Sequence, residues 1–299
     1  MSKPHSNDEH DATTLVPNTP VPAEASRLAA VDQWMAVHPA HPRIAPFLAY
    51  IVLLPVVTFG TDYLPLSYPV LYTIQCVLVG AMLWRYRKLT PELTLSFHWL
   101  AVIVGVGVFV AWIVLGKMMV RLWPAMFEMT DVKVFWDEEY MGPIVGHIGF
   151  SLRLVGMAIL VPLFEELFIR SLALRCLHRR RETGIGILQI LEDLPLIGEW
   201  ILHTNIARQP AHQSAVFSTE FKRTPLGVLS VFGVAASTFV FMLSHNPRDW
   251  PGIWACGIAY CLLLGVTRHK GLGPVIWAHG ITNALLWVYT LQTGDWQFL

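Results

Sequence analysis

Three ionisable side chains lie within six residues of one apolar segment, where each of them is costly. Residues 161–170 read VPLFEELFIR and contain Glu165, Glu166 and Arg170. An ionisable side chain inside a membrane costs on the order of 2.5–3.5 kcal/mol even on lenient insertion scales. Side chains retained at that cost are candidates for chemistry.

The spacing of these residues predicts two different roles for the two glutamates. Successive helical residues point about 100° apart, so Glu165 and Glu166 cannot share a face of a helix. Glu166 and Arg170 are four residues apart, the spacing at which a carboxylate and a guanidinium meet on a helix. We therefore predict an ion pair between Glu166 and Arg170, and a Glu165 side chain that faces the interior of a helical bundle.

Two other apolar segments supply histidines and an amide. The segment Phe241-Met-Leu-Ser-His245 ends on a histidine, and His279-Gly-Ile-Thr-Asn283 places His279 and Asn283 on one helical face. A glutamate can take a proton from water, while imidazole and amide N–H groups can stabilise an oxyanion. Together with Glu165, these side chains form a set suited to acid–base hydrolysis.

The composition indicates what kind of element must position this set. Of the 299 residues, 54% are hydrophobic and only 14% are charged, and the mean hydropathy is +0.50. A soluble domain usually carries about 25% charged residues. The 21 basic and 21 acidic residues balance, which argues against a basic nucleic-acid-binding protein, and the high apolar content argues against a disordered chain. The sequence predicts a polytopic membrane protein.

Seven hydrophobic stretches are long enough to span a bilayer, which takes roughly 20 largely apolar residues. Because each span must satisfy its own backbone hydrogen bonds, the predicted fold class is an all-α transmembrane helical bundle of about seven spans. The stretches are Ile44–Thr61, Tyr63–Trp84, Leu93–Gly116, the charged Gly142–Leu174, Thr224–Pro247, Trp250–Thr267 and Gly271–Gly294.

The distribution of basic residues predicts the orientation. Cytoplasmic loops collect Lys and Arg. With the N-terminus inside, 15 of the 21 Lys and Arg residues fall on the inner side and four on the outer side. The other two, Arg153 and Arg170, lie within the charged span. We expect Arg153 to snorkel toward the interface or to pair with a loop acid such as Asp137 or Glu138.

The chain divides into three regions. Residues 1–43 are polar and Pro-rich and are predicted to be a disordered tail without a cleaved signal peptide. Residues 44–141 contain the N-terminal transmembrane helices. Residues 142–292 contain the candidate residues and a cytoplasmic insert at 178–223, whose amphipathic part (187–202) is suited to the membrane interface. The four cysteines form no C-x-x-C pair and are expected to be small buried residues.

The order E-E-x-x-x-R, F-x-x-x-H and H-x-x-x-N on separate helices resembles the CPBP family of intramembrane proteases, which includes CAAX prenyl proteases and Abi-like proteins. The resemblance covers residues 142–292, about half of the chain. It implies an intramembrane endopeptidase that hydrolyses a peptide bond near the end of a membrane-associated protein. The implied catalytic residues are Glu165, Glu166, His245, His279 and Asn283, with Arg170 and Phe241 as structural support. Among them, Glu165 and His245 would activate water, His279 and Asn283 would bind the oxyanion, and Glu166 with Arg170 would hold the first helix in place.

The resemblance also implies a setting for the reaction. The expected partners are the lipid bilayer and a membrane-bound protein or lipophilic peptide, with no nucleic acid. The expected location is the bacterial cytoplasmic membrane, as a multi-pass protein. Because bacteria generally lack prenylated proteins, the prenyl substrate is not carried over. The long tail and the insert favour a specialised bacterial branch, such as the one associated with exosortase and PEP-CTERM sorting.

The requirement for a metal is left open by the sequence. The family has been labelled as metalloproteases, and Glu165, His245 and His279 would offer three ligands to a zinc ion with one open position. There is no H-E-x-x-H motif, and each candidate ligand comes from a different span. A water activated by glutamate alone needs the same residues, so hydrolysis without a cofactor is favoured over zinc.

Two other functions compete with proteolysis. Chains of Glu and His within membranes also serve transporters and proton relays, although the sequence has no inverted repeat. A non-catalytic immunity or scaffold protein could keep the same fold. The intact motif set favours the endopeptidase.

Overall fold

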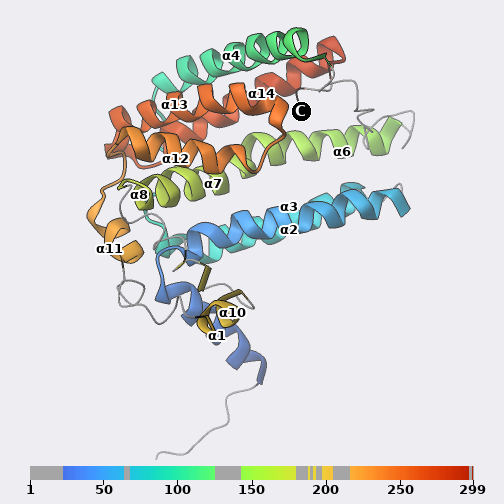
Figure 1. The fold of residues 1–299 in the computed structure, drawn as a ribbon. Helices are drawn as coiled ribbons and strands as arrows, with labels where there is room; N and C mark the ends of the chain where they lie inside the picture. The colour runs from blue at the N-terminus through green and yellow to red at the C-terminus, as the bar shows by residue number, and fades with distance from the viewer. Residues whose placement is uncertain are drawn as a thin grey trace, which may run out of the picture.

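The computed structural model describes residues 23–63, 68–124, 143–179, 188, 191–192, 197–204, 216–295 and 298. Within these residues every regular element is a helix and none is a strand (Figure 1). The predicted all-α fold class is therefore confirmed for this part of the chain.

Each of the seven hydrophobic stretches contains a helix, and the long helices lie roughly alongside one another (Figure 1). They are α2 (His41–Tyr63), α3 (Tyr68–Tyr86), α4 (Leu100–Leu122), a continuous run over residues 143–176, α12 (Val231–Met242), α13 (Trp250–Thr267) and α14 (Gly273–Thr293). The run consists of α6 (Pro143–Val155), η4 (Gly156–Leu160), α7 (Val161–Glu166), η5 (Leu167–Ala173) and α8 (Leu174–Cys176). Shorter elements are α1 (Ala23–Val37), η2 (Arg87–Leu89), α10 (Ile197–Leu202), α11 (Val216–Arg223), η7 (Pro247–Asp249) and η8 (Arg268–Lys270).

Three helical segments among the described residues are long and apolar enough to cross a membrane: His41–Gly60, Leu100–Leu122 and Pro247–Lys270. Only 17% of the apolar window in α4 is buried inside the protein, and side chains such as Ile103 and Val114 are exposed. An apolar surface of this extent is suited to lipid rather than to water. These helices and their exposed apolar side chains indicate a membrane protein.

Helix α12 is shorter than the stretch Thr224–Pro247 in which it lies. Gly227 has a positive φ of 76°, which prevents the helix from starting before it, and the Ser230 side chain accepts a hydrogen bond from Gly233 N to cap the start of α12. Twelve residues rise about 18 Å, less than the thickness of the hydrocarbon core. The expectation of one continuous span is wrong here, and the chain leaves the helix before His245.

Helix α4 begins at Leu100 rather than at Leu93, because the intervening residues bind to the turn before α14. The hydroxyl groups of Thr94 and Ser96 both donate to the carbonyl of Lys270. The amide of Leu272 donates to the carbonyl of Glu92 at 2.9 Å. These contacts replace the hydrogen bonds of a helix and attach the start of α14 to the rest of the bundle.

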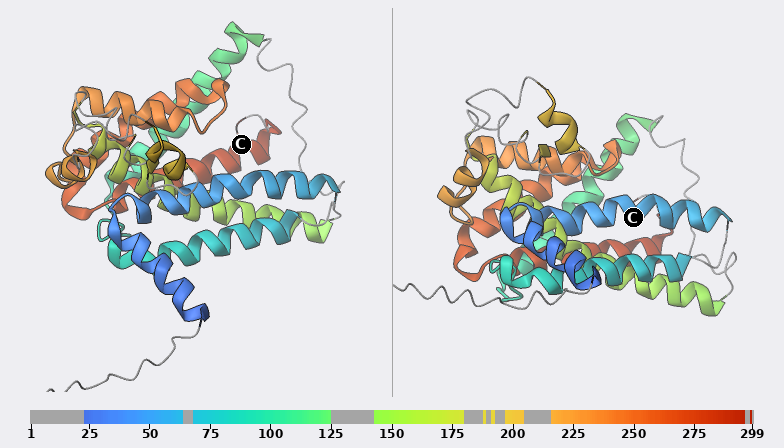
Figure 2. Two further views of the ribbon diagram at one scale, coloured as in Figure 1. Left: turned by 60° about the horizontal axis from the view of Figure 1, so that its bottom comes forward. Right: turned by 90° about the horizontal axis from the view of Figure 1, so that it is seen from below.

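Part of the predicted disordered tail is helical. Residues 1–22 lie outside the described residues, but Ala23–Val37 forms α1, which projects away from the long helices (Figures 1 and 2). Asp32 pairs with Arg85 at 2.6 Å, and the Met35 side chain is buried. The disorder prediction is wrong for this segment because α1 has partners in the bundle that a count of its polar residues does not reveal.

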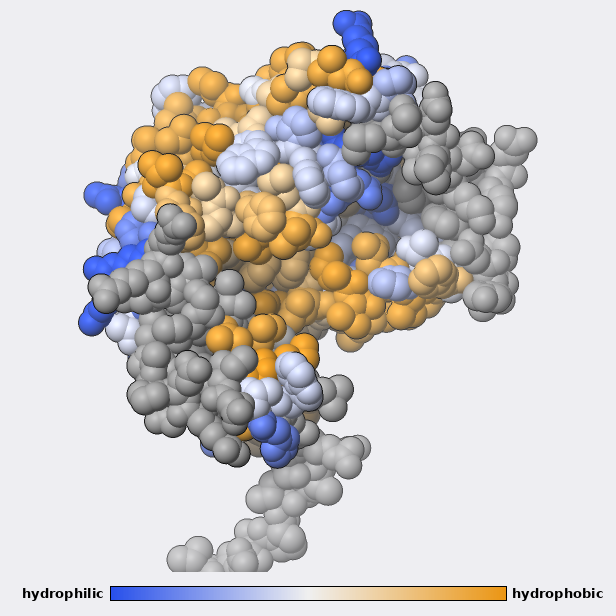
Figure 3. Space-filling view, in the orientation of Figure 1, coloured by the Kyte–Doolittle hydropathy of each residue, from blue (hydrophilic) through white to orange (hydrophobic). Residues whose placement is uncertain are grey.

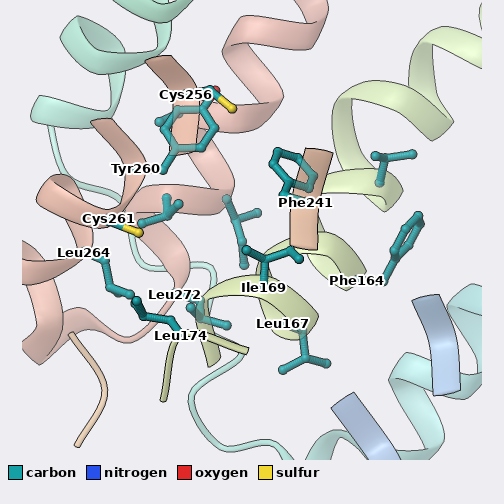
Figure 4. Packing of buried hydrophobic residues seen from close by; sticks show 14 of the residues in the cluster. Phe164, Leu167, Ile169, Leu174, Phe241, Cys256, Tyr260, Cys261, Leu264 and Leu272 are labelled. Atoms are coloured by element: carbon teal, nitrogen blue, oxygen red, sulfur yellow. The ribbon is translucent and has the colours of Figure 1, made fainter. Parts of the chain in front are cut away.

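The run over residues 143–176 lies at the centre of the bundle, in contact with α2, α3, α12 and α14. Its side chains Phe164, Leu167 and Ile169 belong to the main hydrophobic core together with Phe241 and Tyr260, as Figure 4 shows. All five are buried. The helix that carries the intramembrane acids is therefore also the element around which the core is packed.

A buried ion pair fixes one end of this central run. Arg43 Nε and Nη2 donate to the two carboxylate oxygens of Glu92 at 2.6 and 3.0 Å, and the Ser171 hydroxyl donates to the same carboxylate. Burial by itself would raise the pKa of Glu92, but the hydrogen bonds and the charge of Arg43 outweigh it, and the pKa lies below the ordinary value. The pair joins the start of α2, the loop before α4 and the segment η5.

We predict that Glu92→Gln lowers the free energy of unfolding by about 3 kcal/mol, because it leaves the buried Arg43 without its counter-ion. A carboxyl with a lowered folded-state pKa stabilises the protein above its ordinary pKa, and the stabilisation is lost as pH falls through the lowered value. The difference between the wild type and the variant should therefore shrink in acid. Denaturant titration of the detergent-solubilised protein at several pH values measures it.

The matched control is Asp32→Asn, which removes the same kind of charge from an ion pair whose two side chains are 42–51% exposed. Exposed pairs contribute little to stability, so this variant should remain close to the wild type. Equal losses in the two variants would contradict the role given to Glu92.

Candidate active site

The two glutamates lie on α7, between the π-helical segments η4 and η5. A π-helix pairs residues five apart rather than four, is rare, and is frequently found at functional sites. Both segments alter the direction of the side chains around α7. Nothing in the spacing of the sequence had indicated them.

Glu166 is shared by two partners. Its Oε2 lies 3.2 Å from Arg170 Nε, and both side chains are fully buried, so the predicted ion pair is confirmed. Its Oε1 lies 2.7 Å from His279 Nδ1, a contact between residues 113 positions apart. The sequence had not predicted this second contact. Glu166 therefore joins the central run to α14 and fixes the orientation of the His279 ring.

Glu165 faces the other nitrogen of the same imidazole. Its Oε2 lies 3.7 Å from His279 Nε2, and its side chain lines a cavity inside the bundle. The predicted orientation toward the interior of the bundle is confirmed. A separation of 3.7 Å is too long for a direct hydrogen bond and too short for a water molecule between the two atoms, but a water molecule beside them in the cavity can contact both groups.

Phe241 and Tyr260 cover the guanidinium of Arg170. The Arg170 carbon Cζ lies 5.1 Å from the centre of the Phe241 ring and 5.5 Å from that of Tyr260. Such cation–π contacts stabilise a charge that is out of reach of water. The Phe241 ring also lies 4.7 Å from the His245 ring and 6.4 Å from the His279 ring, between centres. The structure therefore brings Phe241 and Arg170 together with both histidines.

His245 reaches the cavity because α12 is short. The chain turns after Met242, and the His245 Nδ1 lies 3.0 Å from the carbonyl of Phe241. The ring lines the same cavity as Glu165 and His279. A helix continued to Pro247 would have carried His245 away along its axis, so the early turn is what places this residue at the cavity.

Asn283 also lines the cavity, and it has a structural contact as well. Its Nδ2 donates to the carbonyl of Met157 in η4 at 2.9 Å. Helix α14 approaches η4 closely here, since a Cβ on Gly280 would lie 2.5 Å from the carbonyl oxygen of Ala158. One N–H of the amide is thus used for packing and the other remains for a ligand.

The cavity has a volume of about 520 Å³, and residues of the connection between α12 and α13, such as Ser244 and Asn246, contribute to its wall. Figure 3 shows hydrophilic residues gathered in this region, next to a largely hydrophobic surface. Besides the candidate residues, its described lining includes side chains that sequence reasoning had not placed in a site: Tyr50, Trp112, Asp249, Tyr260 and Thr282. They come from five different helical segments, so no local pattern could have grouped them.

Among the described residues, no group of three or more His, Cys, Asp or Glu side chains is arranged to hold a metal ion. Of the three zinc ligands considered from the sequence, Glu165 and His279 lie together, at 3.7 Å. His245 lines the same cavity without completing such a group.

Comparison with known proteins adds nothing to these observations: no family model, no curated protein and no solved structure matches the chain. The likeness to intramembrane proteases rests on the motifs of the sequence.

We predict that Glu166→Gln lowers the free energy of unfolding by about 3–5 kcal/mol, because it leaves Arg170 buried without a counter-ion. Glu165→Gln makes the same chemical change one position away, at a carboxylate whose nearest basic partner is 3.7 Å distant, and should leave stability close to that of the wild type. Thermal unfolding in detergent compares the two variants. Replacing the pair together, as Glu166→Gln with Arg170→Met, should recover part of the loss, and failure to recover it would argue against the ion pair as the cause.

Proposed function

We propose that the protein is an intramembrane endopeptidase of the CPBP type, which hydrolyses a peptide bond near the end of a membrane-associated protein. The observation that supports this most strongly is the buried pair of Glu165 and His279 at the wall of a cavity of about 520 Å³. Intramembrane acids are costly, and a buried carboxylate beside an imidazole and a cavity is the arrangement that general acid–base catalysis requires.

In the proposed reaction, a water molecule binds Glu165 at the cavity wall, and His245 assists in orienting it. Glu165 takes a proton as the water oxygen bonds to the carbonyl carbon of the substrate. His279, held by Glu166 at Nδ1, donates from Nε2 to the resulting oxyanion when the ring carries both protons, together with the second N–H of Asn283. Glu165 then passes its proton to the amine as the C–N bond breaks, which leaves a carboxyl and a free amino terminus.

The proposed setting is the bacterial cytoplasmic membrane, with about seven spans and the N-terminus inside. The helical stretches and the excess of Lys and Arg on one side support this topology. The partners are the bilayer and a membrane-bound protein or lipophilic peptide. The bilayer and the surrounding helices keep bulk water from the site, so that the donors facing the oxyanion act in a medium of low polarity.

We predict that Glu165→Gln lowers cleavage by about 10²–10⁴-fold, because the amide cannot accept a proton from water. Quantitative mass spectrometry of protein termini in cells with the wild-type protein, the variant or no protein measures the products. Asp32→Asn, a charge change outside the cavity, is the control and should behave as the wild type. Cells that show no difference in any terminus would contradict proteolysis and favour the immunity or scaffold function, and a solute or ion phenotype in their place would favour a transporter.

No step of the proposed reaction passes through a metal. We therefore predict that purified protein keeps its cleavage activity after dialysis against EDTA and 1,10-phenanthroline. If activity disappears on chelation and returns with one equivalent of zinc, the metal-free mechanism is contradicted. The water would then be activated by a zinc ion held by Glu165 and His279.

A further inference from the structure

The chain turns back after α14 and places Phe298 in the wall of the cavity. Gly294 ends α14 in the left-handed conformation, with a φ of 72°, and its amide donates to the carbonyl of Thr290 at 2.8 Å. The amide of Phe298 then donates to the carbonyl of Asp295 at 3.3 Å, which closes a turn. The Phe298 side chain is buried and lines the same cavity as Glu165. The proposed reaction makes no use of it.

Two helices form a seat for the Phe298 ring. A Cβ added at Gly116 on α4 would overlap the Cε1 atom of this ring and lie 3.3 Å from its Cζ atom, so the ring occupies the space that a side chain at position 116 would fill. The ring centre also lies 5.8 Å from that of Tyr289 on α14, in an edge-to-face arrangement. We call this place between Gly116 and Tyr289 the aromatic seat. The ring can enter it because Gly116 has no side chain.

The attachment of the segment outside the seat is light. The hydroxyl of Tyr289 donates to the carboxylate of Asp295 at 3.0 Å. At the point where the chain turns back, a Cβ added to Gly294 would meet nothing within 4 Å, and the residues from Leu291 to Gly294 are exposed. The Phe298 ring can therefore leave the seat by rotation about this point, without disturbing a helix.

The aromatic seat lies toward the water-facing end of the cavity. His279 and Tyr289 are ten residues apart on α14, which corresponds to a rise of about 15 Å. Beside the seat, Lys117 and Arg121 are exposed near the end of α4, and charged side chains at the ends of spans lie at the boundary between membrane and water. Phe298 therefore lies between this boundary and the residues of the proposed reaction. Hydrolysis consumes water and releases charged chain ends, so an opening toward water is required.

We propose that the segment carrying Asp295 and Phe298 is an autoinhibitory strap. In the closed state Phe298 fills the aromatic seat and shuts the water-facing end of the cavity. In the open state an apolar side chain of the substrate takes the seat in place of Phe298. The proposal rests on the endopeptidase function above and adds its regulation. Because only the open state binds substrate, the apparent affinity is lowered by the fraction of molecules that are open.

Two variants empty the seat from opposite sides. Phe298→Ala removes the ring. Gly116→Ala leaves the strap unchanged but expels the ring, because the new methyl group takes the place of the ring edge. The matched control is Gly107→Ala, the same change on the same helix at a position where a Cβ meets nothing within 4 Å. Tyr289→Phe removes the hydroxyl that holds Asp295 and should have a smaller effect in the direction of the first two.

A thiol in the cavity wall reports opening without any need for proteolysis. Cys256 lines the cavity and is 3% exposed. The full-length protein in lipid nanodiscs is treated with a positively charged methanethiosulfonate reagent that does not cross membranes, and mass spectrometry of peptides measures the labelling rate. We expect Cys256 to be labelled about 10- to 100-fold faster in Phe298→Ala and Gly116→Ala than in the wild type, the factor that corresponds to burial of one aromatic side chain. Gly107→Ala should keep the wild-type rate.

The three other cysteines, Cys76, Cys176 and Cys261, lie outside the cavity wall and serve as internal controls. Faster labelling of Cys256 with unchanged rates at the other three supports the strap. Unchanged labelling of Cys256 in Phe298→Ala would overturn the proposal, because Phe298 would then close nothing. Faster labelling of all four cysteines would also overturn it, because the ring would then support the fold as a whole.

Cleavage tests the inhibitory role. The same proteins are given a pool of random hydrophobic peptides, and each is compared with its own Glu165→Gln form. Phe298→Ala and Gly116→Ala should raise kcat/KM by about 10- to 100-fold, mainly through a lower KM. A lower kcat/KM in both variants would contradict inhibition and make Phe298 a part of the substrate site. If no protein cuts better than its Glu165→Gln form, proteolysis itself is contradicted, and the labelling of Cys256 alone decides whether the strap exists.

Discussion

The buried carboxylate of Glu166 is the group on which the rest of the structure depends. It lies between Arg170 on its own helical run and His279 on α14, so it neutralises a guanidinium and orients an imidazole at the same time. A buried charge without partners costs several kcal/mol, which means that neither contact can be lost without affecting the fold. The contact between Glu166 and His279 Nδ1, which joins the two helices, therefore also orients the Nε2 atom of His279 toward Glu165.

This arrangement explains why two adjacent acids are present. Glu166 is occupied by its partners, while Glu165 has a histidine at 3.7 Å and a cavity in front of it. Glu166 is thus a structural group, and Glu165 is the group to which the proposed reaction gives proton exchange. The division follows from the geometry of a helix, which turns neighbouring side chains to different faces and lets them meet different surroundings. It also allows stability and catalysis to be tested separately at neighbouring positions.

The cavity connects the local chemistry to a substrate. Short α12 and the turn after Met242 place His245 at its wall, while close packing at Gly280 brings α14 against η4. Arg153 lies further along the same central run, held by Tyr68. One continuous helical segment thus carries the proposed base and a second charged side chain of the cavity wall. Their separation is fixed by the rise of the helix and not by a flexible loop.

The sequence by itself determined the features that depend on neighbouring residues. The all-α class, the positions of most helices and the ion pair between Glu166 and Arg170 follow from apolar length and from a spacing of four residues. The predictions that failed concern short segments. Helix α1 lies in the predicted disordered tail, and α4 and α12 start later than the hydrophobic stretches that contain them. At these places contacts with distant residues, or the positive φ of Gly227, override the hydrophobicity of the segment.

Only the tertiary structure decided which side chains share a site. The contact between Glu166 and His279 joins residues 113 positions apart, and the π-helical turns around α7 leave no signal in the spacing. Helix periodicity fixes the face on which a residue lies, but the partner of that face depends on the rotation and depth at which whole helices pack against each other. For that reason the sequence could nominate Glu165, His245 and His279, while the cavity that unites them and the place of Arg153 in its wall came from the fold.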